Sequence, residues 1–333
     1  MPGMRVNRAS EPSYAGVQTF AKLPLVLEPE DLAGVDVAIV GAPIDEAVSH
    51  RPGARFGPRA IRVADVGGGS PPARPNMDLG VDPFEVLSVV DYGDAEVIPA
   101  DKEGSHRAIR RIVGEICAAG AIPIVLGGDH SIAHPDVGAV ADHLKPATLG
   151  LVHFDAHADN ASEVYGATLS HGTPLRYLVE EGSLRGEHIV QVGLRGYWPD
   201  PPDFEWARRQ GFRWHLMEKI TERGMGSVMD DVVDEAGAAD HLFISFDIDV
   251  CDPGFAPGTG TPEPGGMTAR DGLRAVRRLA WEVGFAGMEV VEVSPPYDSA
   301  EITALLANRL VLEALSGLAL RRLGRAPAPE RSR

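Results

Sequence analysis

The sequence predicts an α/β protein in which a central, mainly parallel sheet lies between two layers of helices. Apolar, strand-like segments alternate with helical segments along most of the 333 residues, a pattern typical of parallel sheets covered on both faces. Several apolar segments end directly in acidic residues or histidine, as strands do where the carboxyl edge of such a sheet carries a site. No linker, internal repeat or low-complexity block divides the chain. We therefore expect one domain over residues 35–323, a Pro-rich N-terminal arm over residues 1–34 and a disordered tail over residues 324–333.

The expected strands share a short apolar run that is bounded by glycine, proline or polar residues. In chain order they occupy residues 35–43, 85–94, 121–128, 151–159, 188–196, 211–217, 241–249 and 286–292. The segment 211–217 has the weakest pattern of these.

The expected helices have apolar residues at helical spacing and recognisable ends. Ile109, Val113 and Ile116, for example, share one face of a helix that Gly120 stops. The helices are expected as a short one from Pro58, then over residues 102–120, 131–144, 226–239, 267–283 and 300–323.

Two irregular segments lie between these elements. Arg51, Arg55 and Arg59 could bind an anion, but we favour a packed structural loop because nothing nearby resembles phosphate chemistry. The segment 67–80 is long and rich in glycine and proline, and such loops form either the rim of a site or a mobile segment.

Composition and charge argue against several classes of protein. The chain is 44% hydrophobic and 24% charged, and its two cysteines, Cys117 and Cys251, form no CxxC pattern, so we expect a disulfide-free core in a reducing compartment. A formal net charge of -17 argues against nucleic-acid binding and is compatible with a cationic small substrate. The sequence has neither a signal-peptide pattern nor an apolar stretch of about 20 residues that would span a membrane. We therefore expect a cytoplasmic protein.

Two of the expected strands end in acidic residues or histidine at a spacing of two. In LVHFDAHAD, the residues Asp155, His157 and Asp159 project to one side of an extended backbone. Asp247 and Asp249 end the segment HLFISFDID in the same way. Side chains of this kind at neighbouring strand ends are typical of a metal site.

A third strand, IVLGG, is followed by Asp129 and His130. The three strand ends together offer carboxylates and imidazoles but no thiolate, and the candidate metal ligands are His130, Asp155, His157, Asp159, Asp247 and Asp249. Oxygen-rich sites with some imidazole suit manganese or magnesium better than structural zinc. Six side chains exceed the three that a catalytic zinc keeps, but they suit two ions that share carboxylates. Without metal, four crowded carboxylates would repel one another and could not all stay ionised.

Several longer motifs resemble the signature blocks of the ureohydrolases, the family of arginase and agmatinase. These motifs are GGDHS, FDAHAD, SHGTP, SFDIDVCDPGFAPGTGTPEPGG and EVSPPYD, and they occur in the expected order between about Val35 and Leu320. RPGARFGP and SHGTP look closer to the agmatinase branch than to arginase. The resemblance implies a three-layer α/β/α sandwich of the arginase–deacetylase type and a metal-dependent hydrolase that splits a guanidino compound into urea and an amine.

The resemblance also implies roles for individual residues. Two Mn²⁺ ions would be bound, one by His130, Asp155, Asp159 and Asp247 and the other by His157, Asp155, Asp247 and Asp249, with Asp155 and Asp247 bridging. His171 in SHGTP would protonate the leaving amine, because an imidazole titrates near pH ~6.5. Glu292 would pair with the guanidinium in a fork geometry. The resemblance to ureohydrolases also implies a homo-oligomer, either a trimer or a hexamer.

The substrate expectation depends on the loop NASEVYGATLS, which runs from Asn160 to Ser170. The loop lacks the Ser- and Asn-rich pattern with which arginase meets an α-amino acid, and it contains no Lys or Arg to meet a carboxylate. Its one charge, Glu163, could meet a distal ammonium, and Asn160 is a further candidate for substrate contact. Agmatine, cleaved to putrescine and urea, therefore fits best. Guanidinobutyrate and other guanidino acids or amides stay open, because a basic group could reach in from elsewhere.

Two other functions fit parts of the pattern. A deacetylase on the related fold would keep a single zinc with fewer ligands, but His130 and Asp159 beside the other candidates favour two ions. A non-catalytic metal-binding subunit would usually have lost a ligand or the acid, and none is missing here.

Polar residues beside the candidate ligands have open roles. Asp129 either orients His130 or caps the following helix. His153 alternates with Asp155 along its strand, where we favour core packing over support of a metal site. The histidines outside these motifs are expected at the surface or in ordinary packing, and Cys251 is expected to be buried.

Overall fold

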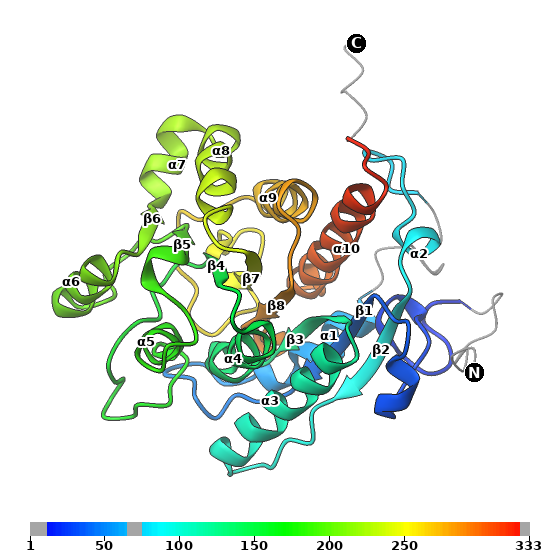
Figure 1. The fold of residues 1–333 in the computed structure, drawn as a ribbon. Helices are drawn as coiled ribbons and strands as arrows, with labels where there is room; N and C mark the ends of the chain where they lie inside the picture. The colour runs from blue at the N-terminus through cyan, green and yellow to red at the C-terminus, as the bar shows by residue number, and fades with distance from the viewer. Residues whose placement is uncertain (1–11, 65–74, 327–333) are drawn as a thin grey trace.

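The computed structural model describes residues 12–64 and 75–326, which form one sheet with helices on both faces (Figure 1). The eight strands follow the order β2-β1-β3-β8-β7-β4-β5-β6, and every neighbouring pair is parallel. They are β1 Val37–Ala42, β2 Val89–Asp94, β3 Ile122–Gly127, β4 Leu149–Phe154, β5 Ile189–Val192, β6 Arg213–His215, β7 His241–Asp247 and β8 Gly287–Val291. Seven of them lie within a predicted segment and β4 begins two residues before its own, at Leu149, so the predicted fold class is confirmed.

The helices cover the sheet between successive strands. They are α1 Gly57–Val63, α2 Pro83–Val86, α3 Lys102–Ala118, α4 Ala133–Leu144, α5 Pro174–Glu180, α6 Pro201–Gln210, α7 Met217–Arg223, α8 Met225–Ala236, α9 Ala269–Glu282 and α10 Ile302–Arg322. Four of them, α2, α5, α6 and α7, were not predicted from the sequence. The sequence had placed a strand from Glu85, but Pro83 begins α2 there and the Asp82 side chain caps it by accepting from Phe84 N.

Alternate residues of each strand face two separate hydrophobic cores. On one face, Ile39 of β1 and Phe246 of β7 pack into a cluster with residues of α1, α7, α8, α9 and α10. On the other face, Val40 and Phe243 pack with residues of α3, α4, α5 and α6. In Figure 1, α8, α9 and α10 accordingly lie on one side of the strands, and α3, α4 and α5 lie on the other.

The last helix, α10, has the length and apolar character of a membrane span, with a mean hydropathy of 1.4 over its most apolar window. However, 78% of that window is buried inside the protein. We therefore interpret α10 as a core helix, packed against α9.

The central strands β3, β8, β7 and β4 are consecutive neighbours in the sheet. Because all of them are parallel, their carboxyl ends meet at one edge. Gly128 allows β3 to turn there, since a Cβ on it would lie 2.4 Å from the Ala42 carbonyl oxygen. The residues that follow these four strands are therefore brought together, although they are up to 163 positions apart in sequence, from Asp129 to Glu292.

The described part of the N-terminal arm packs against the outer strand β2. Phe20, Leu23, Val26 and Leu32 are buried, and the Phe20 N–H donates to Asp91 Oδ2 at 2.7 Å. Residues 1–11 of the arm, 65–74 of the Gly- and Pro-rich loop and 327–333 of the predicted tail lie outside the described residues.

Candidate active site

His130 lies at the centre of a first group of ligand atoms at the carboxyl edge of the sheet. Its Nδ1 is 2.9 Å from Asp159 Oδ2 and 3.2 Å from both Asp155 Oδ2 and Asp247 Oδ2. These residues follow β3, β4 and β7, and all four are buried. Neither His130 Nδ1 nor Asp155 Oδ2 makes a well-aligned hydrogen bond within the described residues, although polar atoms lie 2.9 to 3.2 Å from each of them. Both atoms are therefore positioned to bind a cation.

A second group surrounds His157. Its Nδ1 is 3.0 Å from Asp249 Oδ2 and 3.4 Å from Asp155 Oδ1. Asp249 is held in place by the Ala156 N–H, which donates to Oδ1, and by the Thr261 hydroxyl, which donates to Oδ2, both at 3.2 Å. Because Asp155 directs Oδ2 to the first group and Oδ1 to the second, one carboxylate joins the two.

The electrostatics of this buried cluster favour the binding of cations. Burial raises the pKa of Asp247 well above its usual value, and the neighbouring carboxylates of Asp249 and Asp155 raise it further. Burial and Asp155 likewise raise the pKa of Asp249. A bound divalent ion would relieve this repulsion, and metal binding would displace protons from the cluster. The donor set thus fits two oxygen-preferring divalent ions.

Two further side chains fix Asp155 from the side of the sheet. His153 Nε2 lies 2.9 Å from Asp155 Oδ2, and Gln191 Nε2 lies 3.0 Å from His153 Nδ1. The Gln191 amide therefore donates to Nδ1, which leaves the ring proton on Nε2, facing Asp155. His153 is fully buried, as a core-packing role requires, and its imidazole also lies beside a candidate ligand.

His130 is supported in a similar way on the ring nitrogen that faces away from the cluster. Its Nε2 lies 2.8 Å from Ser245 Oγ and 3.5 Å from Glu289 Oε1. Both partners are fully buried. Hydrogen bonding at Nε2 keeps the Nδ1 lone pair directed into the cluster, as is usual for metal-binding imidazoles.

Asp129 acts through the backbone rather than through the His130 ring. Its Oδ1 accepts from Ser131 N at 2.9 Å, which caps the turn that follows β3, and its Oδ2 accepts from Ala47 N at 3.0 Å. The capping alternative is therefore the one that the geometry supports. The second bond also anchors the loop after β1, the segment that carries Ser49.

His171 lies between two partners. Its Nδ1 is 2.9 Å from Glu292 Oε1, and its Nε2 is 2.8 Å from Ser49 Oγ and accepts from the Ser49 N–H at 3.1 Å. Burial lowers the pKa of His171, but the hydrogen bond and charge of Glu292 outweigh it, and together with Asp159 and Asp129 they raise that pKa to about 9. His171 can therefore carry a proton at neutral pH.

Glu292 follows β8 in a left-handed backbone conformation, with φ of 63°. Its Oε1 accepts from both the His130 N–H, at 3.0 Å, and His171. Its Oε2 is buried and has no partner among the described residues. Glu292 is 1% exposed, and the two-oxygen fork that we expected for it stays a prediction, with Oε2 as the oxygen that has no partner here.

A cavity of about 510 Å³ opens onto the cluster. It is lined by Ser49, His157, Asp159, Glu163, Val164, Tyr165, His171, Gly172, Trp198, Asp200, Asp247, Asp249 and Thr261. Glu163 is among the lining residues and is exposed, and its contact with a substrate stays a prediction. Asn160 is not among the lining residues: it is fully buried, and its Nδ2 lies 3.4 Å from the Asp203 carbonyl oxygen. The expected substrate contact by Asn160 is therefore corrected to a structural role.

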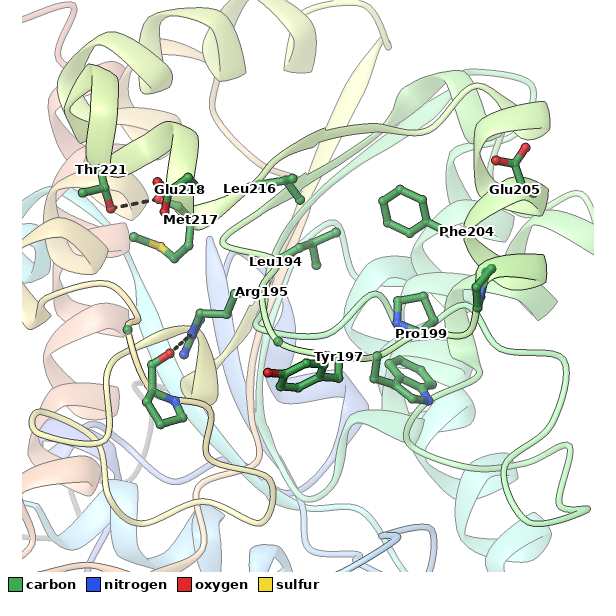
Figure 2. A pocket seen from close by; sticks show the side chains of 15 residues that line it. Leu194, Arg195, Tyr197, Pro199, Phe204, Glu205, Leu216, Met217, Glu218 and Thr221 are labelled. Atoms are coloured by element: carbon green, nitrogen blue, oxygen red, sulfur yellow. Dashed lines mark hydrogen bonds between the residues drawn. The ribbon is translucent and has the colours of Figure 1, made fainter.

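Trp198 also lines a larger cavity, of about 680 Å³. Figure 2 shows this larger cavity with Arg195, Tyr197 and Glu218 among its lining side chains. This cavity contains none of the candidate ligands. Among the described residues that line it, Arg195 is the one basic side chain. Its guanidinium donates to backbone carbonyl groups, including those of Asp249 at 2.9 Å and Pro264 at 3.1 Å. Arg195 thus holds the loop after β7 in place, and we assign the chemistry to the smaller cavity.

In the loop after β1, Arg51 and Arg55 contact neighbouring side chains, as the packed-loop prediction expected, whereas Arg59 is exposed. Arg55 forms an ion pair with Asp45, and the Arg51 guanidinium lies 5.4 Å from the centre of the Tyr297 ring. Asp45 Oδ2 also accepts from Gly53 N at 2.7 Å. These contacts, with the Asp129 bond to Ala47, position Ser49 at the cavity.

A family model described as the arginase family matches residues 35–317. The chain belongs to the arginase family. Members of this family include enzymes that hydrolyse guanidino compounds, and this chain is such an amidinohydrolase. The family assignment argues against both the deacetylase and the non-catalytic alternatives.

Relatives within the arginase family carry different substrate names. The mitochondrial guanidino acid hydrolase of Homo sapiens is 41% identical, over 94% of this chain and 87% of the human one. The mitochondrial agmatinase of Gallus gallus is 40% identical, over 94% and 91% of the two chains. The solved structure of proclavaminate amidinohydrolase from Streptomyces clavuligerus has a TM-score of 0.85 at 36% identity and covers 93% of this chain and 99% of that one.

Three residues at the cavity lie outside every motif and loop that the sequence analysis singled out, namely Ser49, Trp198 and Asp200. None follows an apolar strand directly, so the pattern that revealed the ligands was absent. Asp200 carries the only available signal, because an acidic residue before two prolines is a typical helix start.

Proposed function

We propose that this amidinohydrolase uses two manganese ions to cleave agmatine into urea and putrescine. The observation that carries the proposal is the pair of buried ligand groups joined by Asp155 beside a cavity with an acidic outer end. The residues that would hold the ions are those named from the resemblance: His130, Asp155, His157, Asp159, Asp247 and Asp249. Manganese suits this mixture of carboxylates and imidazoles.

The ions would supply Lewis acidity, which would lower the pKa of a bound water molecule toward neutrality. The remaining steps fall to side chains of this chain. Glu292 Oε2 would accept a hydrogen bond from the guanidinium and orient its carbon. The water oxygen would bond to that carbon, and the bond from the carbon to the alkylamine nitrogen would break. The two protons lost by the water would leave with the amine as an ammonium, one of them by way of His171. His171 donates the proton that the departing amine takes up.

The preference for agmatine is supported by the charges at the cavity. Glu163 lies at its outer end, and no Lys or Arg lines it within residues 12–64 and 75–326. A substrate with an ammonium tail would be attracted there, whereas the carboxylate of guanidinobutyrate would be repelled. Relatives named for either kind of substrate are about equally similar, so the names alone do not decide.

Urea release from a panel of guanidino compounds tests this proposal. Metal-depleted protein is expected to be inactive and to recover with Mn²⁺, with kcat/KM in the order agmatine, guanidinobutyrate, arginine. Faster turnover of guanidinobutyrate than of agmatine would show that the substrate ends in a carboxylate rather than an ammonium. The assignment as a metal-dependent hydrolase would remain valid. Full activity without metal would refute the metal-dependent mechanism.

Assembly and compartment are further parts of the proposal. We expect a homo-oligomer, a trimer or hexamer, and light scattering that finds only monomers at micromolar concentration would contradict it. The two cysteines, Cys117 and Cys251, are both unpaired and buried, which suits a reducing compartment such as the cytoplasm.

A further inference from the structure

The outer half of the cavity is built by two segments that are distant in sequence. One is the loop after β4, which contributes Glu163, Val164 and Tyr165. The other lies between β5 and α6 and contributes Trp198 and Asp200. The candidate ligands form the inner end, so any substrate whose guanidinium reaches them must extend along these two segments.

Trp198 forms an apolar wall directly beside the reacting groups. Its ring stands edge-on to His157, with ring centres 6.2 Å apart and an interplanar angle of 72°. It also packs onto Gly172, next to His171: a Cβ on Gly172 would lie 3.0 Å from Trp198 Cη2 and 3.2 Å from Val164 Cγ2. Gly172 therefore lets Trp198 and Val164 close over this point. The wall suits an uncharged, methylene part of a substrate.

Asp200 occupies the N-cap position of α6, yet its side chain makes no capping hydrogen bond. An aspartate at this position usually accepts from the first backbone N–H groups of its helix. Asp200 lines the cavity instead. The next acidic residue, Asp203, forms an ion pair with Arg176, with Oδ1 2.7 Å from Nη2. Arg176 is therefore paired with Asp203 and not with Asp200.

The start of α6 offers no site for a carboxylate, although helix N-termini often bind anions. Its first two residues, Pro201 and Pro202, have no N–H group. The next two N–H groups, of Asp203 and Phe204, donate to the Asp200 carbonyl oxygen at 3.0 and 3.2 Å. This end of the cavity therefore accepts hydrogen bonds but does not donate them from the backbone.

We infer that Trp198 and Asp200 determine substrate specificity, Trp198 by packing on the methylene spacer and Asp200 by binding the distal ammonium together with Glu163. The inference rests on the proposed function and names the residues that would select a linear guanidino-amine over a guanidino acid. Neither residue touches the guanidinium in this assignment.

Three probes with the same four-carbon spacer separate the two contributions. Agmatine ends in an ammonium, n-butylguanidine in a methyl group and guanidinobutyrate in a carboxylate. Asp200→Asn is expected to raise KM for agmatine about fivefold, the scale of a partly exposed charge pair. It should leave n-butylguanidine unchanged and lower KM for guanidinobutyrate. Trp198→Ala should raise KM for agmatine and n-butylguanidine alike, and Trp198→Phe should restore most of the loss.

Glu205→Gln is the matched control, because Glu205 lies on α6 and lines only the larger cavity. It should leave all three KM values unchanged. Inhibition by putrescine gives a readout without turnover, and Asp200→Asn should weaken it while leaving inhibition by n-butylamine unchanged. Thermal unfolding confirms that each variant is folded, and Asp200→Ser replaces Asp200→Asn if the latter is not.

If Asp200→Asn changed KM equally for agmatine and n-butylguanidine, or changed neither, the inference would be overturned. The proposed function would still hold in that case, provided that the unmodified enzyme releases urea. Absence of urea release from all three compounds by the unmodified, manganese-loaded enzyme would instead refute the proposed function.

Discussion

The imidazole of His171 is joined to the carboxylate of Glu292, with Nδ1 2.9 Å from Oε1. The same oxygen accepts from the His130 N–H at 3.0 Å, so one carboxylate links the proposed proton donor to the backbone of a candidate ligand. This arrangement holds the His171 ring at a fixed distance from the cluster. It also explains how a histidine outside the ligand motifs becomes part of the same site.

Replacing His171 tests its role as proton donor. His171→Ala should lower kcat for agmatine by about 10²–10⁴, the usual effect of losing a general acid, and should leave the metal content unchanged. Metal analysis of the purified variant, beside the urea assay, separates the two effects. Loss of metal would instead make His171 a ligand and overturn the assignment.

Ser49 is expected to influence the pH at which His171 gives up its proton. When His171 Nε2 carries no proton, it accepts a hydrogen bond from the Ser49 N–H. When Nε2 is protonated, it can donate to the Ser49 hydroxyl. Since His171 has a pKa raised to about 9, its acid form is present below that pH and activity should fall above it. Ser49→Ala removes the acceptor for the charged form. The alkaline limb of the kcat profile should therefore move to lower pH by about one unit.

Ser49→Thr keeps a hydroxyl and serves as the control, with its alkaline limb close to that of the unmodified enzyme. An unchanged pH profile in Ser49→Ala would mean that the hydroxyl does not stabilise the protonated imidazole.

The strand ends could be predicted from the sequence, and the surrounding loops could not. Asp155, His157 and Asp159 follow an apolar run at a spacing that fixes their direction, and parallel strands bring such ends to one edge of a sheet. The loop that carries Ser49 is fixed by two hydrogen bonds: the Ala47 N–H donates to Asp129 Oδ2 at 3.0 Å, and the Gly53 N–H donates to Asp45 Oδ2 at 2.7 Å. Those contacts join residues that no local pattern connects.

The differences at single residues have similar physical causes. Asn160 opens the loop that was expected to meet the substrate, yet its amide turns toward the Asp203 carbonyl. His153 was expected to pack in the core, and it is fully buried, but Gln191 orients its ring toward Asp155. Spacing along a strand gives the direction of a side chain, while its partner depends on the neighbouring strand.

Acid is expected to destabilise the protein through His106. This residue is 6% exposed, and burial, followed by His134 and Lys102, lowers its pKa to about 3. In the unfolded chain its pKa is about 6.5. The unfolded state therefore binds the proton first, and the contribution to stability that exists above pH 6.5 is lost as the pH falls toward 3. The slope is about 1.4 kcal/mol per pH unit.

His106→Gln should reduce this acid sensitivity, because glutamine does not titrate and can bond to Ser131 Oγ, which lies 2.9 Å from His106 Nε2. Urea unfolding at pH 7 and pH 5 gives the two stabilities. His143→Gln, on the exposed end of α4, is the control and should keep the sensitivity of the unmodified protein. An equal pH dependence in His106→Gln and the unmodified protein would contradict the assignment.

The two ligand groups predict different metal contents for two variants. Asp249 belongs to the group around His157 alone, with Oδ2 3.0 Å from Nδ1, whereas Asp155 directs one oxygen to each group. Asp249→Ala should therefore lose about one Mn²⁺ per chain and Asp155→Ala nearly both, each with loss of urea release. Elemental analysis of protein dialysed against a fixed Mn²⁺ concentration measures both contents. Asp252→Ala removes a nearby carboxylate that holds the Gly265 N–H at 2.8 Å and lies outside both groups, so it should keep both ions. If Asp155→Ala and Asp249→Ala lost the same amount of metal, Asp155 would not join two sites.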